Sequence, residues 1–114
     1  MKVLRGEVWW IDFDPSIGSE IQKLRPAVVV SNDRSNDKLE RYQVLPLSTQ
    51  VTKIYPTEVL IRFKNKASKA MADQLTTVSR KRMKNRAGSL DQQTMDTIDA
   101  AIMRQLDLTS KRKP

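Results

Sequence analysis

The sequence contains neither cysteine nor histidine among its 114 residues. Without cysteine, the chain has no disulfide, no thiolate nucleophile and no zinc–thiolate site. Without histidine, it lacks the commonest metal ligand and the commonest general base of enzymes. No apolar run approaches the roughly 18 residues that a membrane-spanning helix needs. These absences predict a soluble, cytoplasmic protein without a metal or cofactor, in which catalysis would depend on carboxylates, guanidinium groups and hydroxyls.

The charge of the chain is unevenly distributed. The formal net charge is +8 and the sequence pI is about 10.1. Residues 1–61 carry 8 basic and 8 acidic side chains, whereas residues 62–114 carry 13 basic and 5 acidic ones, so the whole excess lies in the second part. Such an asymmetry indicates a nucleic acid or an acidic partner. The alternative is a basic surface that only keeps the protein soluble.

The length favours one domain, here expected over residues 1–110, followed by a basic tail over residues 111–114. Alternating and β-branched apolar residues predict short strands over residues 7–13, 26–31, 42–47, 57–62, 73–78 and 84–89. Residues 32–40 are expected to form a turn with one helical turn, residues 64–69 an exposed connection, and residues 79–82 a short helical turn.

One long helix is expected over residues 91–106, where four apolar side chains repeat every three or four positions: Met95, Ile98, Ile102 and Leu106. Ser89 or Asp91 is the candidate N-cap, and Ser89 with Gln92 fits a capping box. Many short strands followed by a helix imply a mainly β fold, a compact antiparallel barrel or half-barrel closed by that helix. Side chains fill the interior of so small a barrel, so a ligand site is expected in surface loops.

Glu20, Arg25, Ser48 and Thr49 carry the chemistry that this composition permits. RNA supplies its own nucleophile, the 2′-hydroxyl, and cleavage requires a base, stabilisation of an anionic phosphorane and protonation of the leaving oxygen. Glu20 is a candidate base if it is partly buried or lies near other carboxylates. Arg25 offers donors that match phosphate oxygens, and Ser48 or Thr49 can donate one further hydrogen bond.

Each candidate also has a purely structural interpretation. Arg25 can be a solvated side chain before a strand, Glu20 can cap a turn or pair with Lys23, and Ser48–Thr49 can simply end a strand. Trp10 can stack on a nucleobase or belong to the core or a dimer interface. The strongest phosphate-binding stretch, or else a solvated face, consists of Arg80, Lys81, Arg82, Lys84 and Arg86. Asp12, Asp14 and Asp33 lack the companions of a metal site.

At the front of the chain, three segments read RGEVWWIDFDP (residues 5–15), GSE (residues 18–20) and RPAVVVSND (residues 25–33). Later segments read PLSTQ (residues 46–50), PTEV (residues 56–59) and ADQ (residues 72–74). In this order, and with the closing amphipathic helix, the chain resembles the MazF/PemK family of toxin endoribonucleases along nearly its whole length.

The resemblance implies an SH3-like β-barrel with helices that forms a homodimer. It implies metal-independent, sequence-specific cleavage of single-stranded RNA that leaves a 2′,3′-cyclic phosphate and a 5′-hydroxyl. It also implies an antitoxin whose acidic, disordered tail occupies the RNA groove, with DNA contacted only through the antitoxin complex. On the matching positions, Arg25 is catalytic, Ser48 assists it, Glu20 has a catalytic role and Gln74 lies near RNA. From the basic and aromatic residues, Lys23, Arg80, Arg82, Arg86 and Trp10 are further RNA-binding candidates.

Two positions depart from the family pattern. Ser48 replaces a threonine, which keeps the hydroxyl but loses the methyl group that restricts χ1, and Thr49 is the alternative hydroxyl. Residues 21–24 replace a spacer rich in glutamine and glycine, which implies a different cut sequence or weaker activity. Two rival functions stay open at this point: a toxin of the same fold that poisons DNA gyrase without cutting, and a non-catalytic RNA-binding module.

Overall fold

The computed structural model describes residues 1–15, 17, 18, 20 and 23–108. The expected tail over residues 111–114, Ser19 of the GSE segment and the first half of the 21–24 spacer lie outside the described residues. The elements are β1 Glu7–Asp12, β2 Leu24–Val29, α1 Asp33–Lys38, β3 Arg41–Ser48, β4 Glu58–Phe63, β5 Lys66–Met71, η1 Ala72–Gln74, β6 Thr76–Ser79, η2 Arg80–Arg82, β7 Met83–Ser89 and α2 Gln92–Gln105, where η marks a 3₁₀ turn.

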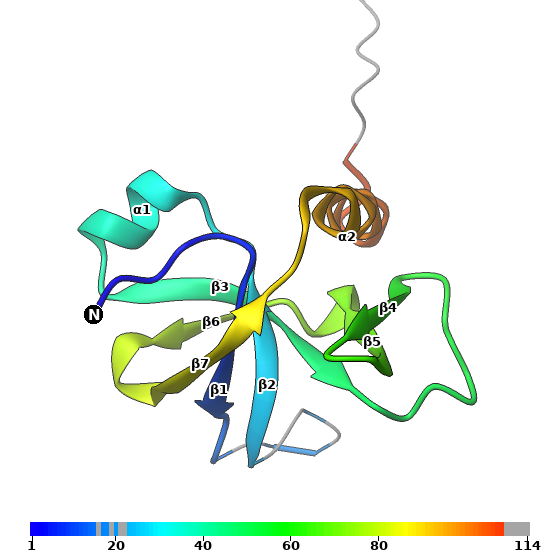
Figure 1. Ribbon diagram of the computed structural model, residues 1–114, viewed down its shortest axis with the longest axis horizontal. Helices are drawn as coiled ribbons and strands as arrows, with labels where there is room; N and C mark the ends of the chain where they lie inside the picture. Colours follow the sequence, from blue (N-terminus) through cyan, green and yellow to red (C-terminus); the bar gives the residue numbers. More distant parts are fainter. Residues whose placement is uncertain (16, 19, 21–22, 109–114) are drawn as a thin grey trace, which may run out of the picture.

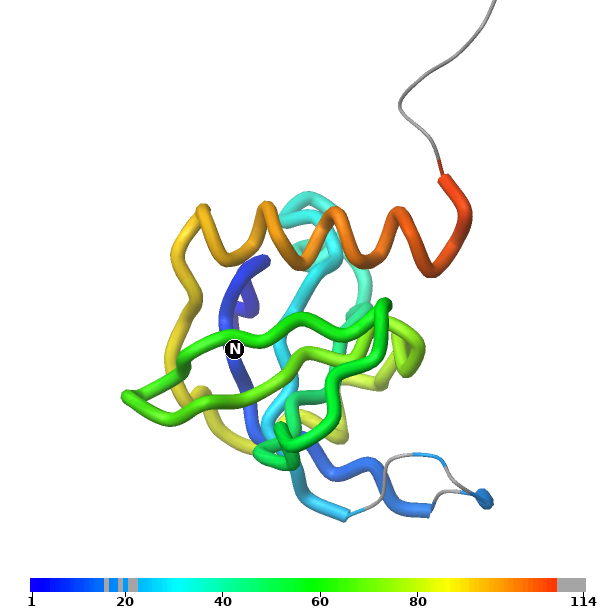
Figure 2. The backbone as a smooth tube through the Cα atoms, turned by 90° about the vertical axis from the view of Figure 1, so that its right-hand side faces the viewer, coloured from blue at the N-terminus to red at the C-terminus, as the bar shows by residue number. Residues whose placement is uncertain are grey.

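The strands form one antiparallel sheet in the order β4-β5-β3-β2-β1-β7, and β6 adds to β3 beside this path. The expected fold class, mainly β with a C-terminal helix, is confirmed, although the sheet is not strictly closed into a barrel. Figures 1 and 2 show α2 across one end of the sheet, while β1 ends and β2 begins at the opposite end. In the described part of the chain, no helix has the length and apolar character needed to cross a membrane.

Both faces of the central strands are buried. Val8 and Val28 pack with α2, β4 and β5 in one apolar cluster, whereas Trp9, Ala27 and Val29 pack with β6 and β7 in another. Successive strand residues point to opposite faces, so a strand covered on both sides must be apolar throughout. This explains the uninterrupted run in β2 and confirms its expected place as a central strand. Val8 is fully buried within this chain.

Two expected boundaries are wrong. Residues 64–69 are not an exposed connection, because β5 occupies residues 66–71 and buries Ser68 and Lys69. Residues 73–78 are only partly strand, because η1 takes up the first two of them and β6 begins at Thr76. In both cases, pairing with a neighbouring strand decided the structure of a polar segment whose own pattern was weak.

Helix α2 covers the first apolar cluster with Met95, Ile98 and Ala101, which are all buried. The expected apolar stripe holds at its start but not at its end, because Leu106 follows the helix and is 49% exposed. The N-cap is Asp91, whose side chain accepts the backbone N–H of Thr94 at 2.8 Å, so the capping box that starts at Ser89 is not formed.

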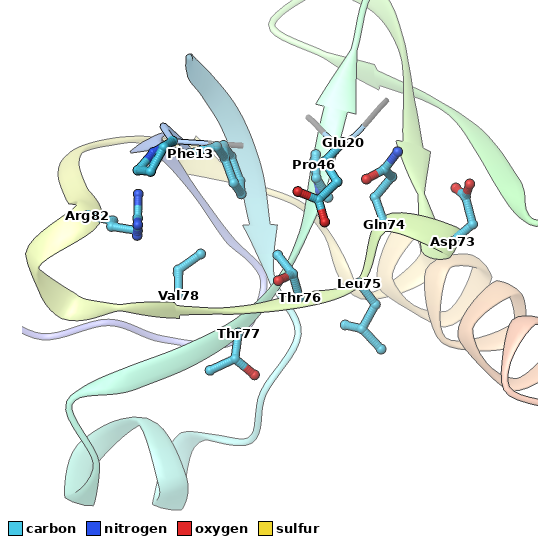
Figure 3. Close-up of a pocket in the computed structure, with 11 residues that line it drawn as sticks. Phe13, Glu20, Pro46, Asp73, Gln74, Leu75, Thr76, Thr77, Val78 and Arg82 are labelled. Atoms are coloured by element: carbon cyan, nitrogen blue, oxygen red, sulfur yellow. The ribbon is translucent and has the colours of Figure 1, made fainter. Parts of the chain in front are cut away.

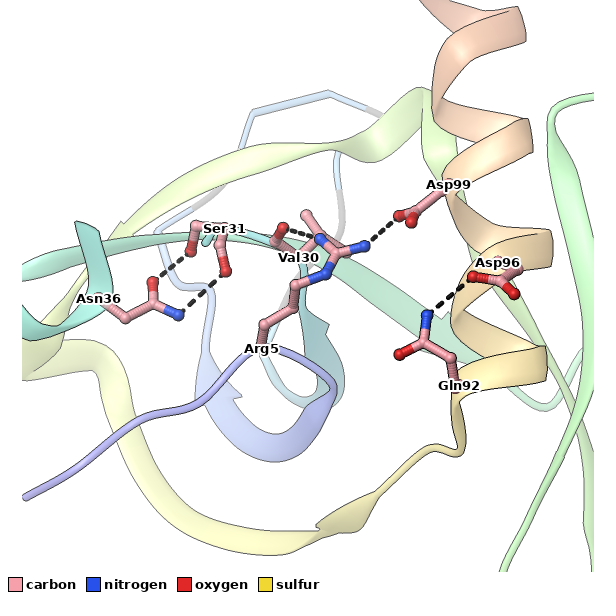
Figure 4. A network of polar contacts seen from close by, with 7 residues as sticks. All are labelled: Arg5, Val30, Ser31, Asn36, Gln92, Asp96 and Asp99. Atoms are coloured by element: carbon pink, nitrogen blue, oxygen red, sulfur yellow. Dashed lines mark hydrogen bonds and ion pairs between the residues drawn. The ribbon is translucent and has the colours of Figure 1, made fainter. Parts of the chain in front are cut away.

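A polar network joins the N-terminal segment to α2 (Figure 4). The guanidinium group of Arg5 donates to the carbonyl of Val30 and forms an ion pair with Asp99 of α2. Beside it, Ser31 donates from its hydroxyl to the side-chain oxygen of Asn36 at 2.6 Å. The network links the end of β2 to α1 and α2. It lies at the end of the sheet that is away from the β1–β2 connection.

Substituting Asp91 tests the cap. Its hydrogen bonds with Thr94 hold the pKa of the Asp91 carboxyl below its usual value. Because the folded-state pKa is the lower one, the stabilisation is present above the unfolded-state pKa and is lost as pH falls through the folded-state pKa. We expect Asp91→Ala to lower the melting temperature at pH 7, with a difference that shrinks at strongly acidic pH. Asp91→Asn should retain most of the stability, because asparagine caps well. A stable Asp91→Ala variant beside a destabilised Ser89→Ala variant would contradict this assignment.

Candidate functional site

The register between β2 and β3 brings Arg25 and Ser48 to the same place. Ala27 lies opposite Pro46 and Val29 opposite Val44, and Arg25 and Ser48 each lie two residues beyond the Ala27–Pro46 pair. Strand alternation puts both on the sheet face that carries Ala27 and Pro46. The two residues come from different β-strands, yet they line one surface pocket.

This arginine pocket has a volume of about 280 Å³. Its lining consists of Trp10, Lys23, Leu24, Arg25, Pro26, Leu47, Ser48, Thr49 and Ser68. Five of these are residues that the sequence singled out, so the structure gathers Trp10, Lys23, Arg25, Ser48 and Thr49 around one hollow. It holds an aromatic ring, two cations and several hydroxyls, and it has no carboxylate in its lining.

The two candidate hydroxyls differ in their surroundings. Ser48 is 9% exposed, and its oxygen accepts the backbone N–H of Gln50 at 3.1 Å. Accepting this bond orients the hydroxyl and leaves its hydrogen to be donated to a ligand. Thr49 is exposed and follows the end of β3. The geometry therefore favours Ser48 as the oriented donor.

A second hollow, the glutamate pocket, lies beside the first and has a volume of about 460 Å³ (Figure 3). It contains Glu20, Gln74 and Arg82, which come from the β1–β2 connection, η1 and η2. Its other lining residues are Phe13, Pro15, Pro46, Asp73, Leu75, Thr76, Thr77 and Val78. Figure 3 shows Glu20 close to Pro46, with Gln74 on one side of the hollow and Arg82 on the other.

The two pockets meet along β3. Pro46 lines the glutamate pocket and Ser48 the arginine pocket, and two strand residues span roughly 7 Å. Glu20 and Arg25 thus belong to neighbouring hollows on one side of the sheet and do not share a single pocket. We refer to the two pockets together as the candidate groove, because residues of β3 line both of them.

Glu20 also has a structural role. Its carboxylate accepts the backbone N–H of Ile17 at 2.8 Å, and its own N–H donates to the carbonyl of Ile17 at 3.2 Å. These bonds close a turn, as the structural interpretation of this residue expected. The side chain is exposed, so the partial burial expected of a carboxylate base is absent.

Arg82 is held by the β1–β2 connection. Its guanidinium group donates to the carbonyl of Asp12 at 3.0 Å and to the carbonyl of Asp14. The side chain of Asp14 in turn accepts the backbone N–H of Lys23 at 2.8 Å. Arg82 therefore fastens the connection that carries Glu20, and it forms a wall of the glutamate pocket while doing so.

The structure separates the other basic candidates from the groove. Arg80 lies 3.9 Å from Glu40, beside the phenol of Tyr42, whose pKa is raised by burial and lowered in part by Arg80. Arg86 donates from its Nε to Glu7 at 3.0 Å, and neither Arg80 nor Arg86 lines either pocket. No group of three or more acidic, histidine or cysteine side chains is suited to a metal ion within the described residues.

The sequence did not point to Leu24 or Ser68 in the arginine pocket. The signal for Ser68 was hidden because residues 64–69 look polar and were expected to be an exposed connection. Pairing of β5 with β3, in which Ser48 lies opposite Lys69, brings this segment to the pocket.

Comparison with known proteins agrees with this fold. Residues 4–106 match the family described as PemK-like, MazF-like toxin of type II toxin–antitoxin system. Endoribonuclease MazF9 of Mycobacterium tuberculosis is 36% identical over 93% of this chain and 98% of its own length. Endoribonuclease EndoA of Bacillus subtilis is 32% identical over 95% of this chain and 97% of its own length. The crystal structure of MazF (Form-I) from Deinococcus radiodurans has a TM-score of 0.84 at 21% identity and covers 95% of this chain and 99% of that chain.

An open antiparallel sheet with a C-terminal helix, together with these relatives, thus defines a small toxin of the endoribonuclease class. The chain belongs to the PemK-like, MazF-like toxin family of type II toxin–antitoxin systems.

Substituting Arg82 tests its role in holding the β1–β2 connection. Arg82→Met removes two hydrogen bonds from a charged donor, so we expect a loss of roughly 1–3 kcal/mol in the free energy of unfolding. The neighbouring Lys81 is exposed, and Lys81→Met should change this free energy by less than about 0.5 kcal/mol. Urea titration of both variants measures the difference. Equal stabilities would show that the guanidinium group is not an anchor and is available to a ligand.

Proposed function

We propose that the chain cleaves single-stranded RNA at a phosphodiester held between Arg25 and Ser48. The observation that carries this proposal is the shared pocket, whose lining includes the guanidinium-bearing Arg25 and the oriented hydroxyl of Ser48. Both groups donate hydrogen bonds, and a phosphate in the act of transfer accepts them at its equatorial oxygens.

In the proposed reaction, the 2′-oxygen forms a bond to phosphorus and the bond to the 5′-oxygen breaks. The departing 5′-oxygen takes a proton from solvent water, so the products are a 2′,3′-cyclic phosphate and a 5′-hydroxyl, and the substrate itself supplies the nucleophile. The guanidinium group of Arg25 stabilises the negative charge that builds up on the phosphorane. Ser48 donates from its hydroxyl to the same group, and removing one such donor typically costs about 2.7–4 kcal/mol of barrier height.

Glu20 is our candidate for the group that accepts the proton of the 2′-hydroxyl. The linings of the two pockets contain only two carboxylates, Glu20 and Asp73, and both belong to the glutamate pocket. Gln74 lies in the same hollow and would contact the nucleotide beside the scissile bond. Trp10 and Lys23 would contact the RNA at the arginine pocket.

The partners that we propose follow from this site and from the relatives. A described mycobacterial structure is an endoribonuclease in complex with its cognate antitoxin, with a TM-score of 0.76 at 23% identity. We propose an antitoxin with an acidic segment as the regulator of this chain, since the same donors that hold RNA phosphates would hold carboxylates. We also propose a homodimer and a cytoplasmic site of action, where RNA and antitoxin are present. Leu24, which is 52% exposed, is a candidate for the dimer surface.

RNA cleavage in the presence of EDTA tests the function. Purified protein incubated with a long defined RNA should give discrete fragments with 5′-hydroxyl ends, and Arg25→Ala should lower the rate by roughly 10²–10³ because one preorganised charge contact is lost. Arg34→Ala is the matched control, since Arg34 lies exposed on α1.

Intact RNA with the parent protein would reject the nuclease, whereas an active Arg25→Ala variant would reject only the role of Arg25. Binding without cleavage would favour an RNA-binding module, and inhibition of gyrase would favour the topoisomerase poison.

Single-residue variants decide between the two hydroxyls. Ser48→Ala should lower kcat by about 10² with little change in KM, because the hydroxyl acts on the phosphorane. Ser48→Thr should keep most of the activity, and Thr49→Ala should keep nearly all of it. Steady-state kinetics on a short RNA measure these values. A large loss in Thr49→Ala beside an active Ser48→Ala variant would assign the role to Thr49.

A further inference from the structure

Lys69 is a buried cation, although it lies on the face of β5 that points away from the core. It lies opposite Leu60 in the β4–β5 pair, and Leu60 is 60% exposed, yet Lys69 is only 8% exposed. Val59 and Ile61 point to the opposite face, into the core. Its burial therefore comes from a neighbouring segment, which its contacts identify as the β3–β4 loop of residues 49–57.

A small set of polar contacts fastens this loop. The ammonium group of Lys69 lies 3.0 Å from Oε1 of Glu58 and donates to the carbonyl of Lys53 at 3.1 Å. It also lies 5.7 Å from the centre of the Tyr55 ring. The same Glu58 oxygen accepts the backbone N–H of Tyr55 at 2.9 Å. One ion pair thus holds the backbone of the loop at two points.

The energetics indicate a role in orientation. Both side chains are largely buried. The exposed fraction of the side chain alone is 10% for Lys69 and 7% for Glu58. Desolvating two charges offsets most of their attraction, and a well-packed apolar pair of similar volume is often as stable. Replacing the buried ion pair with leucine and methionine should therefore change the free energy of unfolding little. It does supply directed hydrogen bonds, which apolar side chains cannot make to the loop backbone.

The loop adjoins the proposed cleavage site. Lys69 lies opposite Ser48 in the β3–β5 pair, and its neighbour Ser68 lines the arginine pocket. Tyr55 is 52% exposed and Lys53 is exposed, with its ammonium group 5.6 Å from the centre of the Tyr55 ring. An exposed aromatic ring beside a cation is suited to a stacked nucleobase and its phosphate.

We propose that Glu58 and Lys69 are positioning residues that hold the β3–β4 loop so that Tyr55 and Lys53 bind a nucleotide flanking the scissile phosphate. This inference rests on the proposed RNA cleavage and assigns to it a determinant of substrate affinity. Neither Glu58 nor Lys69 touches the reacting atoms, so their effect is on RNA binding and not on the chemical step.

The decisive variant is Glu58→Leu/Lys69→Met, which removes the ion pair without changing the net charge. We expect its melting temperature to stay near that of the parent and its KM for a short RNA to rise about tenfold, the scale of one lost base contact. Its kcat should stay within about twofold. An unchanged KM in this folded variant would overturn the proposal, since a merely structural pair predicts that result.

Tyr55→Ala provides a second test that does not disturb the buried pair. It should raise KM by a similar factor, and combining it with Glu58→Leu/Lys69→Met should add little, because both changes remove the same contact. Lys66→Met is a control for the loss of a lysine from β5, because Lys66 is exposed at the far end of that strand and is not part of the buried pair. Unchanged KM in Tyr55→Ala, or full additivity, would contradict the assigned contact.

Amide hydrogen exchange separates this inference from the nuclease proposal. Exchange at Tyr55 should be faster in Glu58→Leu/Lys69→Met than in the parent, and unchanged in Lys66→Met. Equal exchange in the parent and the double variant would reject the anchor even if RNA is cleaved. If exchange is faster in the double variant but the parent protein leaves RNA intact, the anchoring role of the ion pair stands and the nuclease proposal is rejected.

Discussion

The register of β2 against β3 is the constraint on which the candidate site depends. Ala27 opposite Pro46 sets which face of each strand meets which apolar cluster, and Arg25 and Ser48, two residues further along their strands, line one pocket. A slip by one residue would turn every side chain of β2 to the other face and move Arg25 away from Ser48. The apolar residues on both faces of β2 prevent such a slip, since it would break both clusters at once. The core therefore holds the site in place in a chain that has no cysteine to form a disulfide.

Three basic residues of the second part of the chain pair with acids of the first part. Arg86 pairs with Glu7, Arg80 with Glu40 and Lys69 with Glu58. Exposed pairs contribute little to stability, but they fix where a cation points. The charge available to a ligand is consequently smaller than the composition implies.

Several polar groups at the groove both build it and line it. Arg82 holds the carbonyls of Asp12 and Asp14 while it forms a pocket wall, and Glu20 closes a turn with Ile17 while it lines the same hollow. Polar side chains that are already hydrogen-bonded lose less conformational entropy when a ligand binds. A groove of this kind is prepared for its substrate by contacts within the protein.

The sequence alone determined the fold class, the central place of β2, the helix at the end of the chain and the candidates Arg25, Ser48 and Glu20, because periodicity and local motifs depend on neighbouring residues. It misplaced β5, whose polar residues become a strand only by pairing with β3 and β4. Only the tertiary structure decided that Arg25 shares a pocket with Ser48 while Glu20 lines the adjoining one, and that Lys69 is buried against Glu58. These are contacts between distant segments, set by strand register and loop packing, which no local pattern of residues specifies.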